Sequence, residues 1–413
     1  MSSLISSQQP TSKGLRPHIS IFGTRNAGKS SLLNRILGQS LSIVSHIPGT
    51  TTDPVSRAYE LQPVGPVMFI DTAGIDDEGE LGAQRIEKSN KVLAKTDIAI
   101  QLITPQGLTK YDRELINTYS KKKLQWFFVI NKQDISDEVT LNKLKKDLTE
   151  IYNVPVISCS ALLDTGIWDI KDQLVSFIKS REPDPLVVAD LVKSPSTVVL
   201  VTPIDAEAPK GRMILPQAQV QVELLDAGNT VVVCTEKELE YTLKHTLKHL
   251  PDLVVTDSQV FGMVAKLIPE EVPLTSFSIL FARQKGDIEQ YTKGLEAIEK
   301  LKDGDTILIL ELCSHAPIGE DIGRVKIPKW LQAKTGLKLN FETQVGNDFS
   351  FDNSKHKLIV QCGGCVVNRQ EIMSRLEDAK SAGIPITNYG VIIAYINGIT
   401  ERVLQPFNLA KTR

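Results

Sequence analysis

Short apolar runs alternate with stretches of helical periodicity along most of the chain, and this alternation predicts an α/β protein with parallel sheets. Runs rich in β-branched and aromatic residues predict strands at 18–22, 67–70, 126–130, 154–157, 197–201, 230–234, 253–256, 274–280, 305–312 and 357–360. Apolar positions at helical spacing predict helices at 31–37, 217–226, 237–248, 259–267, 287–301 and 369–382.

Length and linker composition predict three domains. A chain of 413 residues is long enough for several domains of ~150 residues each. The charged, proline-broken segment 181–185 suits neither helix nor strand, so a boundary is expected there. We predict units over 14–180, 186–268 and 271–413, and we expect residues 1–13 to form a frayed tail.

The first predicted strand leads into the segment 23–30 (GTRNAGKS), and a helical pattern follows. This order of strand, GxxxxGKS and helix is typical of a phosphate-binding loop. Glycines let backbone amides approach the phosphates, the lysine reaches the β- and γ-phosphate oxygens, and the serine binds Mg²⁺. The nucleotide-binding residues predicted here are Gly23, Asn26, Gly28, Lys29, Ser30 and Ser31.

Two further segments follow in the order expected of a nucleotide switch. The loop 48–53 holds three threonines, of which we favour Thr51 as a Mg²⁺ ligand, although an ordinary Ser/Thr-rich loop has the same composition. After the run 67–70 comes Asp71, which would hold Mg²⁺ through water, and then Gly74, whose amide would contact the γ-phosphate.

The segment 131–134 (NKQD) predicts that the base is guanine. The Asp134 carboxylate can accept hydrogen bonds from the N1–H and N2–H donors of guanine, which adenine does not offer. Asn131 and Lys132 belong to the same motif, and the backbone amides of Ser160 and Ala161 would cap the guanine O6. We therefore predict GTP and GDP as ligands.

Together these motifs resemble the TrmE and Era group of translation-factor-like GTPases over about residues 15–180. Ile75 stands where Ras-like proteins carry the glutamine that positions water. The resemblance implies that Asn26 holds K⁺ beside the phosphates, and we hypothesise potassium-stimulated GTP hydrolysis. The predicted catalytic set is Asn26, Lys29, Thr51 and Gly74.

The middle unit carries no phosphate loop and no paired acid and base, so we expect an interaction or dimerisation domain. His245 and His249 have a spacing that can bind metal on a helix, but the intervening residues lack the glutamate of HExxH and lysines flank them. We expect surface histidines. Cys159 and Cys234 are most simply small buried residues.

The last unit carries candidate metal ligands after two predicted strands. Cys313 and His315 follow the strand 305–312, and the segment 361–365 (QCGGC) follows the strand 357–360. Loops at the carboxyl ends of parallel strands share one edge of a sheet, where sites are built. Cys313, His315, Cys362 and Cys365 would suit zinc as a Cys₃His site or an iron–sulfur cluster equally well.

The order of a TrmE-like GTPase domain, a central α/β domain and a C-terminal CxH and CxxC domain resembles the HydF family of [FeFe]-hydrogenase maturation GTPases and scaffolds. The resemblance implies a [4Fe–4S] cluster on Cys313, Cys362 and Cys365, carriage of a di-iron precursor and its delivery to apo-[FeFe]-hydrogenase. It also implies a homodimer through the middle domain, with the radical-SAM maturases HydE and HydG as partners.

One position departs from this family. Many members carry histidine directly before CxxC, whereas this chain has Gln361, so no ligand role is transferred to that residue. The fourth position on the cluster is then open to His315, a carboxylate, solvent or the di-iron precursor. His356 is expected to be a solvated loop histidine.

Composition excludes some other classes. Five cysteines in a chain of this length argue against a disulfide framework and favour a reducing, cytoplasmic location. The net charge of −2 does not indicate the basic surface that nucleic-acid-binding proteins usually carry. No apolar run reaches the ~20 residues of a membrane helix. The alternative interpretation is a zinc-stabilised regulatory GTPase acting on RNA. A third, less favoured interpretation is an iron–sulfur redox enzyme with a GTP switch.

Overall fold

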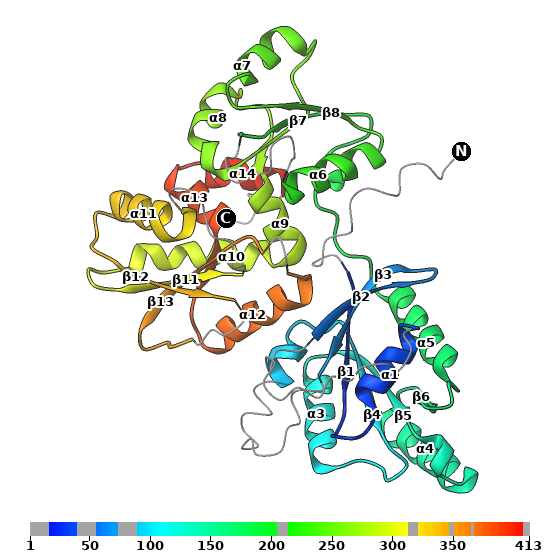
Figure 1. The fold of residues 1–413 in the computed structure, drawn as a ribbon. Helices are drawn as coiled ribbons and strands as arrows, with labels where there is room; N and C mark the ends of the chain where they lie inside the picture. Colours follow the sequence, from blue (N-terminus) through cyan, green and yellow to red (C-terminus); the bar gives the residue numbers. More distant parts are fainter. Residues whose placement is uncertain are drawn as a thin grey trace. The chain divides into compact units, whose positions relative to one another are not determined.

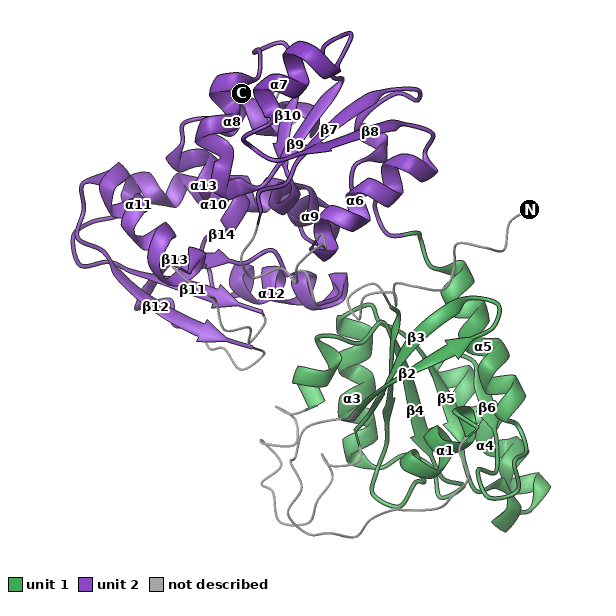
Figure 2. Cartoon of the chain, turned by 45° about the horizontal axis from the view of Figure 1, so that its top comes forward, with its two compact units in different colours: residues 1–183 green, residues 184–413 purple. Residues whose placement is uncertain are grey.

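The computed structural model describes residues 16–38, 55–72, 89–204, 214–312, 321–346, 351–364 and 367–407. The first of its sheets lies in the N-terminal part of the chain and two more follow, each with helices packed against it (Figure 1). The chain divides into two compact units, residues 1–183 and 184–413 (Figure 2). The predicted fold class, α/β with parallel sheets, is confirmed. No helix in these ranges is both long and apolar enough to cross a membrane.

The first unit is built on a six-stranded sheet with the order β2-β3-β1-β4-β5-β6. All neighbouring pairs are parallel except the antiparallel pair of β2 and β3. The strands are β1 (His18–Phe22), β2 (Val55–Leu61), β3 (Gly65–Asp71), β4 (Ile98–Ile103), β5 (Gln125–Ile130) and β6 (Val156–Ser158). The strands β1, β3, β5 and β6 match predicted strands, whereas β2 and β4 were not predicted.

Helices cover both faces of this sheet. They are α1 (Lys29–Ile36), α3 (Lys110–Lys121), α4 (Glu138–Tyr152) and α5 (Ile167–Ser180), with the 3₁₀ turn η3 at Gln133–Ile135. Apolar side chains of α1 and α5 form one core with the sheet, and those of α3 and α4 form a second. Because the five parallel strands end at one edge, the loops that follow them are gathered there.

The second unit begins with the turn η4 (Ala189–Leu191) and a four-stranded parallel sheet with the order β10-β9-β7-β8. Its strands are β7 (Thr197–Val201), β8 (Thr230–Cys234), β9 (Leu253–Thr256) and β10 (Leu274–Ser276). Its helical segments are α6 (Leu215–Asp226), α7 (Leu239–Tyr241), the π-helical η5 (Thr242–Thr246), η6 (Ser258–Val260) and α8 (Phe261–Leu267). The helix predicted at 237–248 is therefore shorter than expected and changes to π geometry.

The second sheet of this unit has the order β12-β11-β13-β14 and is also parallel throughout. Its strands are β11 (Thr306–Glu311), β12 (Asn340–Val345), β13 (His356–Gln361) and β14 (Ile386–Asn388). The helical segments are α9 (Phe277–Lys285), α10 (Ile288–Gly294), η7 (Leu295–Lys300), η8 (Ile322–Lys326), α11 (Ile327–Thr335), α12 (Arg369–Ser381), α13 (Tyr389–Ile396), α14 (Thr400–Leu404) and η9 (Gln405–Phe407).

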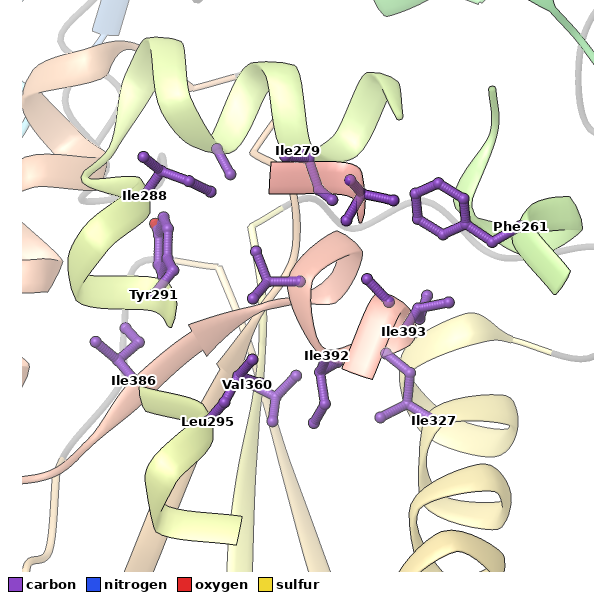
Figure 3. Packing of buried hydrophobic residues seen from close by; sticks show 14 of the residues in the cluster. Phe261, Ile279, Ile288, Tyr291, Leu295, Ile327, Val360, Ile386, Ile392 and Ile393 are labelled. Carbon is purple, nitrogen blue, oxygen red and sulfur yellow. The ribbon is translucent and has the colours of Figure 1, made fainter. Parts of the chain in front are cut away.

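The prediction of a strand at 274–280 was wrong beyond Ser276. Ser276 accepts a hydrogen bond from the Ile279 amide at 3.2 Å, so it caps the helix α9 instead of continuing the strand. The short strand β10 pairs with β9 in the first sheet of this unit. The continuous apolar run is explained by the burial of α9 on two sides. Phe277, Leu280 and Phe281 join one core, whereas Ile279 and Ala282 join the other, part of which Figure 3 shows.

Candidate functional site

The loop between β1 and α1 has a backbone that requires glycine at two positions. Gly23 and Gly28 have φ angles of +150° and +94°, in the region that favours glycine. A Cβ atom at Gly23 would lie 2.2 Å from the Leu102 carbonyl oxygen, and one at Gly28 would lie 2.3 Å from Nδ2 of Asn131. Both glycines therefore let neighbouring groups close around the loop, as phosphate binding requires.

Lys29 and Ser30 begin α1 directly after this loop. The Lys29 side chain is only 5% exposed, and its Nζ donates to the carbonyl oxygens of Gly23 and Thr24 at 2.7 and 3.1 Å. The Ser30 hydroxyl donates to Oδ2 of Asp71 at 3.0 Å, because Asp71 ends β3, the neighbour of β1. The structure thus brings together the predicted phosphate lysine and two predicted Mg²⁺ ligands, both of which offer the oxygen donors that Mg²⁺ prefers.

Other predicted residues of this centre are placed differently. Asn26 lies at the exposed tip of the loop with φ at +63°, and Ser31 lies within α1. Thr51 and Gly74 lie outside the described residues, so their predicted roles stay predictions.

The base-binding motif is organised around Asn131, which is buried. Its Nδ2 donates to the Ala27 carbonyl at 2.8 Å, and its Oδ1 accepts from the Ala161 amide at 3.0 Å. Asn131 therefore connects the phosphate loop to the loop after β6. Lys132 has a φ angle of +61° and precedes the turn η3, which presents Asp134 to solvent.

The loop after β6 is held by contacts that the sequence motif does not reveal. The Ser160 amide donates to the Thr165 carbonyl at 3.0 Å, so both predicted guanine-capping amides have partners within the protein. Arg35 of α1 donates from Nε to the Ala161 carbonyl at 2.9 Å and from Nη2 to the Leu162 carbonyl at 3.1 Å. No local signal marks Arg35, because its partners are more than a hundred positions away.

Cys159 of this loop is fully buried, and its thiol donates to Oδ1 of Asn131 at 3.5 Å. Burial, reinforced by the nearby charge of Asp134, raises the pKa of the Cys159 thiol to about 12. The thiol therefore stays neutral, which confirms the prediction of a small buried residue.

The predicted metal ligands follow β11 and β13, which are neighbouring parallel strands with Leu310 opposite Gln361. The Leu312 amide donates to Sγ of Cys362 at 3.2 Å, and the Cys362 amide donates to the Leu310 carbonyl at 2.9 Å. The two segments therefore leave the sheet side by side. Cys313, His315 and Cys365 lie outside the described residues, so their mutual geometry stays a prediction.

Cys362 is the one predicted metal ligand of this loop whose surroundings the structure describes. Backbone N–H groups that bond to cysteine sulfur are among the features that tune such clusters. Gly364 has φ at +60°, and a Cβ there would lie within 3.0 Å of side-chain atoms of Ile372, Leu312 and Val367, so this turn needs glycine. In the ranges that the structure describes, no group of three His, Cys, Asp or Glu side chains is arranged to hold a metal ion.

Three family models match separate parts of the chain. Residues 187–286 match the model described as the hydrogen maturase F dimerization domain, and residues 289–406 match the hydrogen maturase F tetramerization domain. The chain belongs to the hydrogen maturase F (HydF) family. Residues 18–132 match the model described as 50S ribosome-binding GTPase, so this member of the HydF family contains a GTPase domain ahead of the other two matched domains.

Curated relatives match the GTPase domain. GTPase Der of Campylobacter concisus is 35% identical over 178 residues, which are 41% of this chain and 37% of the relative. The tRNA modification GTPase MnmE of Clostridioides difficile is 32% identical over 160 residues, 38% of this chain and 34% of the relative. The chain thus spans about a third of the length of these relatives.

Two solved structures are also similar to parts of the chain. A single-substitution variant of Aquifex aeolicus Era bound to GDP and AlF₄⁻ is 21% identical with a TM-score of 0.34, covering 55% of this chain and 96% of that one. The FeoB G-domain of Methanococcus jannaschii is 18% identical with a TM-score of 0.31, covering 40% of this chain and 99% of that one.

Gln361 departs from the HydF pattern expected before CxxC, and the structure gives its side chain another environment. The residue is fully buried, and its Nε2 donates to the hydroxyl of Tyr291 in α10 at 3.0 Å. Among the described residues its Oε1 has no hydrogen-bond partner. Burial raises the pKa of Tyr291, so this hydroxyl stays protonated beside Gln361.

Three further histidines with predicted environments lie in the described residues, namely His245, His249 and His356. The prediction that His356 is a solvated loop residue was wrong: it is buried and begins β13, at the opposite end from Cys362. Its Nε2 lies 3.3 Å from Oε2 of Glu342. The prediction that His245 and His249 are surface residues is confirmed, and His249 lies beyond the end of η5.

Proposed function

We propose that this HydF-family chain is a GTP-hydrolysing scaffold that binds a [4Fe–4S] cluster and carries a di-iron precursor to apo-[FeFe]-hydrogenase. Cys313, Cys362 and Cys365 would hold the cluster, and His315 is a candidate for its fourth position. The observation that carries the proposal is the 3.2 Å contact between the Leu312 amide and the Cys362 sulfur, because Leu312 is the residue that precedes Cys313 in the chain. The bound cluster would supply an iron site at which the di-iron precursor docks.

The residues of the second unit prepare this site. The parallel register of β11 and β13 delivers both cysteine segments to one sheet edge, and Gly364 lets the second segment turn sharply. The Leu312 amide orients the Cys362 sulfur and stabilises negative charge on it. The family model over residues 187–286 supports a homodimer through this middle part of the chain, and the model over residues 289–406 supports further self-association. Apo-hydrogenase and the maturases HydE and HydG would be the partners.

In the GTPase domain, Lys29 would neutralise phosphate charge, while Ser30 and Asp71 would hold Mg²⁺. Thr51 would complete the metal shell and Gly74 would contact the γ-phosphate. This machinery lies in the first unit, whereas Cys362 lies in the second. We infer that hydrolysis governs association with partners and not the chemistry of the cluster.

The proposal is tested by anaerobic reconstitution of the full chain with iron and sulfide, EPR of the reduced protein and activation of apo-hydrogenase. A brown protein with thiolate-to-iron absorption and a cluster EPR signal is expected. A colourless protein that retains one zinc ion after anaerobic purification would instead support the zinc-stabilised regulatory GTPase.

Potassium is expected to accelerate GTP hydrolysis at least about tenfold over sodium at equal ionic strength, below the ~10³–10⁵ of an arginine finger. The side chain proposed to hold K⁺ is that of Asn26. Its positive φ is one that glycine adopts without strain, so Asn26→Gly removes the side chain and keeps the backbone. The variant should hydrolyse GTP equally fast in KCl and NaCl. Equal rates for the wild-type protein would contradict the proposal.

Asp134→Asn is expected to weaken GTP binding by about 1–3 kcal/mol, or ~5–150-fold, because it removes the acceptor for two guanine donors. Xanthine carries a carbonyl in place of the 2-amino group, so the variant should bind xanthosine triphosphate more tightly than the wild type does. Fluorescent-nucleotide titration measures both affinities. Asp164→Asn is the matched control, since Asp164 is exposed nearby and its φ of +60° is one that asparagine tolerates. Unchanged GTP affinity in Asp134→Asn would exclude this role.

A further inference from the structure

The cysteine loop after β13 is bound to α9 by a buried lysine. Lys285, the last residue of α9, is 3% exposed. Its Nζ donates to the Gly364 carbonyl at 3.0 Å and to the Val367 carbonyl at 2.9 Å. A buried ammonium group is costly unless it is hydrogen-bonded, so these contacts specify the position of both carbonyls. In the chain, the Gly364 and Val367 carbonyls lie on either side of Cys365, the second cysteine of the CxxC motif.

A second cation makes the reciprocal contact. Arg369, the first residue of α12, donates from Nη1 to the Gln284 carbonyl at 2.6 Å and to the Gly286 carbonyl at 3.3 Å. Thus α9 contributes a cation to the cysteine loop, and the helix that follows the loop contributes a cation to the end of α9. The end of α9 and the start of α12 are therefore joined by hydrogen bonds to Gln284 and Gly286, the two residues that flank Lys285.

The helix that carries Lys285 is itself held rigidly. Phe277, Leu280 and Phe281 pack in a core on one face of the first sheet of the unit. Ile279 and Ala282 pack in a larger core to which both sheets of the unit contribute. Displacement of α9 would disturb both cores, because protein interiors are close-packed. Lys285 therefore connects the loop to a helix whose position is set by the β7–β10 sheet as well as by the β11–β14 sheet.

We propose that Lys285 is a positioning residue for the thiolate site: its ammonium group clamps the loop that follows Cys362 and so presets the site before metal binds. This inference rests on the proposed function only in that the loop binds metal. A preset loop loses little conformational freedom on binding, so the clamp raises metal affinity. Groups that orient ligands from outside the metal shell typically contribute ~10–100-fold in affinity.

The test uses the full chain without cluster, titrated anaerobically with Co²⁺ and followed by thiolate-to-cobalt absorption. Lys285→Met keeps the length of the side chain but removes the charge and the donors, and ~10–100-fold weaker Co²⁺ binding is expected with shifted ligand-field bands. Lys285→Arg keeps a donor for the two carbonyls and should recover part of the affinity. Lys329→Met, at an exposed position of α11, should bind Co²⁺ like the wild type.

The outcomes separate this inference from the proposed function. Absence of the thiolate band in the wild type, or an unchanged band with unchanged Co²⁺ affinity in Cys362→Ser, would defeat the proposed thiolate site itself. A wild-type band together with wild-type affinity in folded Lys285→Met would overturn the clamp alone. The clamp is also overturned if Lys285→Arg loses as much affinity as Lys285→Met while both melt at the same temperature, since a cation would then make no difference.

Discussion

Replacing Lys29 by alanine is expected to slow GTP hydrolysis by at least ~10²-fold and to leave the iron content of the protein unchanged. The Lys29 ammonium is buried within the phosphate-binding loop, where its hydrogen bonds to the Gly23 and Thr24 carbonyls set its position. A preorganised donor of this kind is worth ~10²–10³ in rate when charge develops on the phosphates. Alanine removes both the charge and the donor, so the loss should appear in the rate at saturating GTP and Mg²⁺.

The same preparation provides the second measurement. Lys29 lies in the unit 1–183 and Cys362 lies in the unit 184–413, so the proposal predicts that iron and sulfide per chain equal those of the wild type. Lys110→Ala is the matched control, because the Lys110 side chain is 93% exposed on α3 and faces no proposed ligand. Loss of iron from folded Lys29→Ala would contradict the separation of hydrolysis from cluster binding. Undiminished hydrolysis would contradict the role of the lysine.

Several strands that were predicted correctly have a burial that matches their apolar sequence. The runs at β5 and β7 are apolar after their first residue, as expected of strands covered on both faces. The strand β4 was missed although it is fully buried, because Gln101 interrupts its apolar run. The Gln101 side chain is satisfied inside the protein by Asp112 and Tyr119, residues of α3 that a local pattern does not connect to β4.

The errors in the second unit have a similar origin. The helix α9 is apolar on two sides because it packs into two cores, so its sequence has the continuous apolar character of a buried strand. Short apolar runs do not distinguish these cases by periodicity alone. Only the tertiary arrangement, with Ser276 capping the helix, decides between them.

In the candidate sites, motif residues were predictable and the residues that support them were not. Lys29, Ser30 and Asp134 belong to short segments whose spacing alone indicates nucleotide chemistry. Arg35 and Lys285 act on carbonyls 126 and 79 positions away, respectively, so no local pattern marks them. Every residue has a backbone carbonyl, so the sequence does not show which carbonyls Arg35 and Lys285 will bind. The tertiary packing of the chain determines this.

Replacing Cys362 by serine is expected to remove most of the bound iron while GTP hydrolysis stays at the wild-type rate. Serine keeps the size and the hydrogen-bonding ability of the residue, so the Leu312 amide retains an acceptor and the fold is preserved. Iron–sulfur clusters are held by thiolates, and a hydroxyl is a poor substitute for a thiolate toward iron in such a cluster. Loss of a direct ligand should exceed the ~10–100-fold in affinity that supporting groups contribute.

Iron and sulfide analysis, absorption spectra and reduced-state EPR of the anaerobically reconstituted protein measure the loss in Cys362→Ser. Cys234→Ser is the matched control, because Cys234 is a partly buried thiol at the end of β8, in the other sheet of the same unit. Its iron content should equal that of the wild type. Full iron content in Cys362→Ser would exclude this thiol as a ligand, and equal loss in both variants would show that the effect is not specific to the edge formed by β11 and β13. Iron lost from Cys362→Ser alone, with hydrolysis retained, would assign the metal chemistry to the second unit and the nucleotide chemistry to the first.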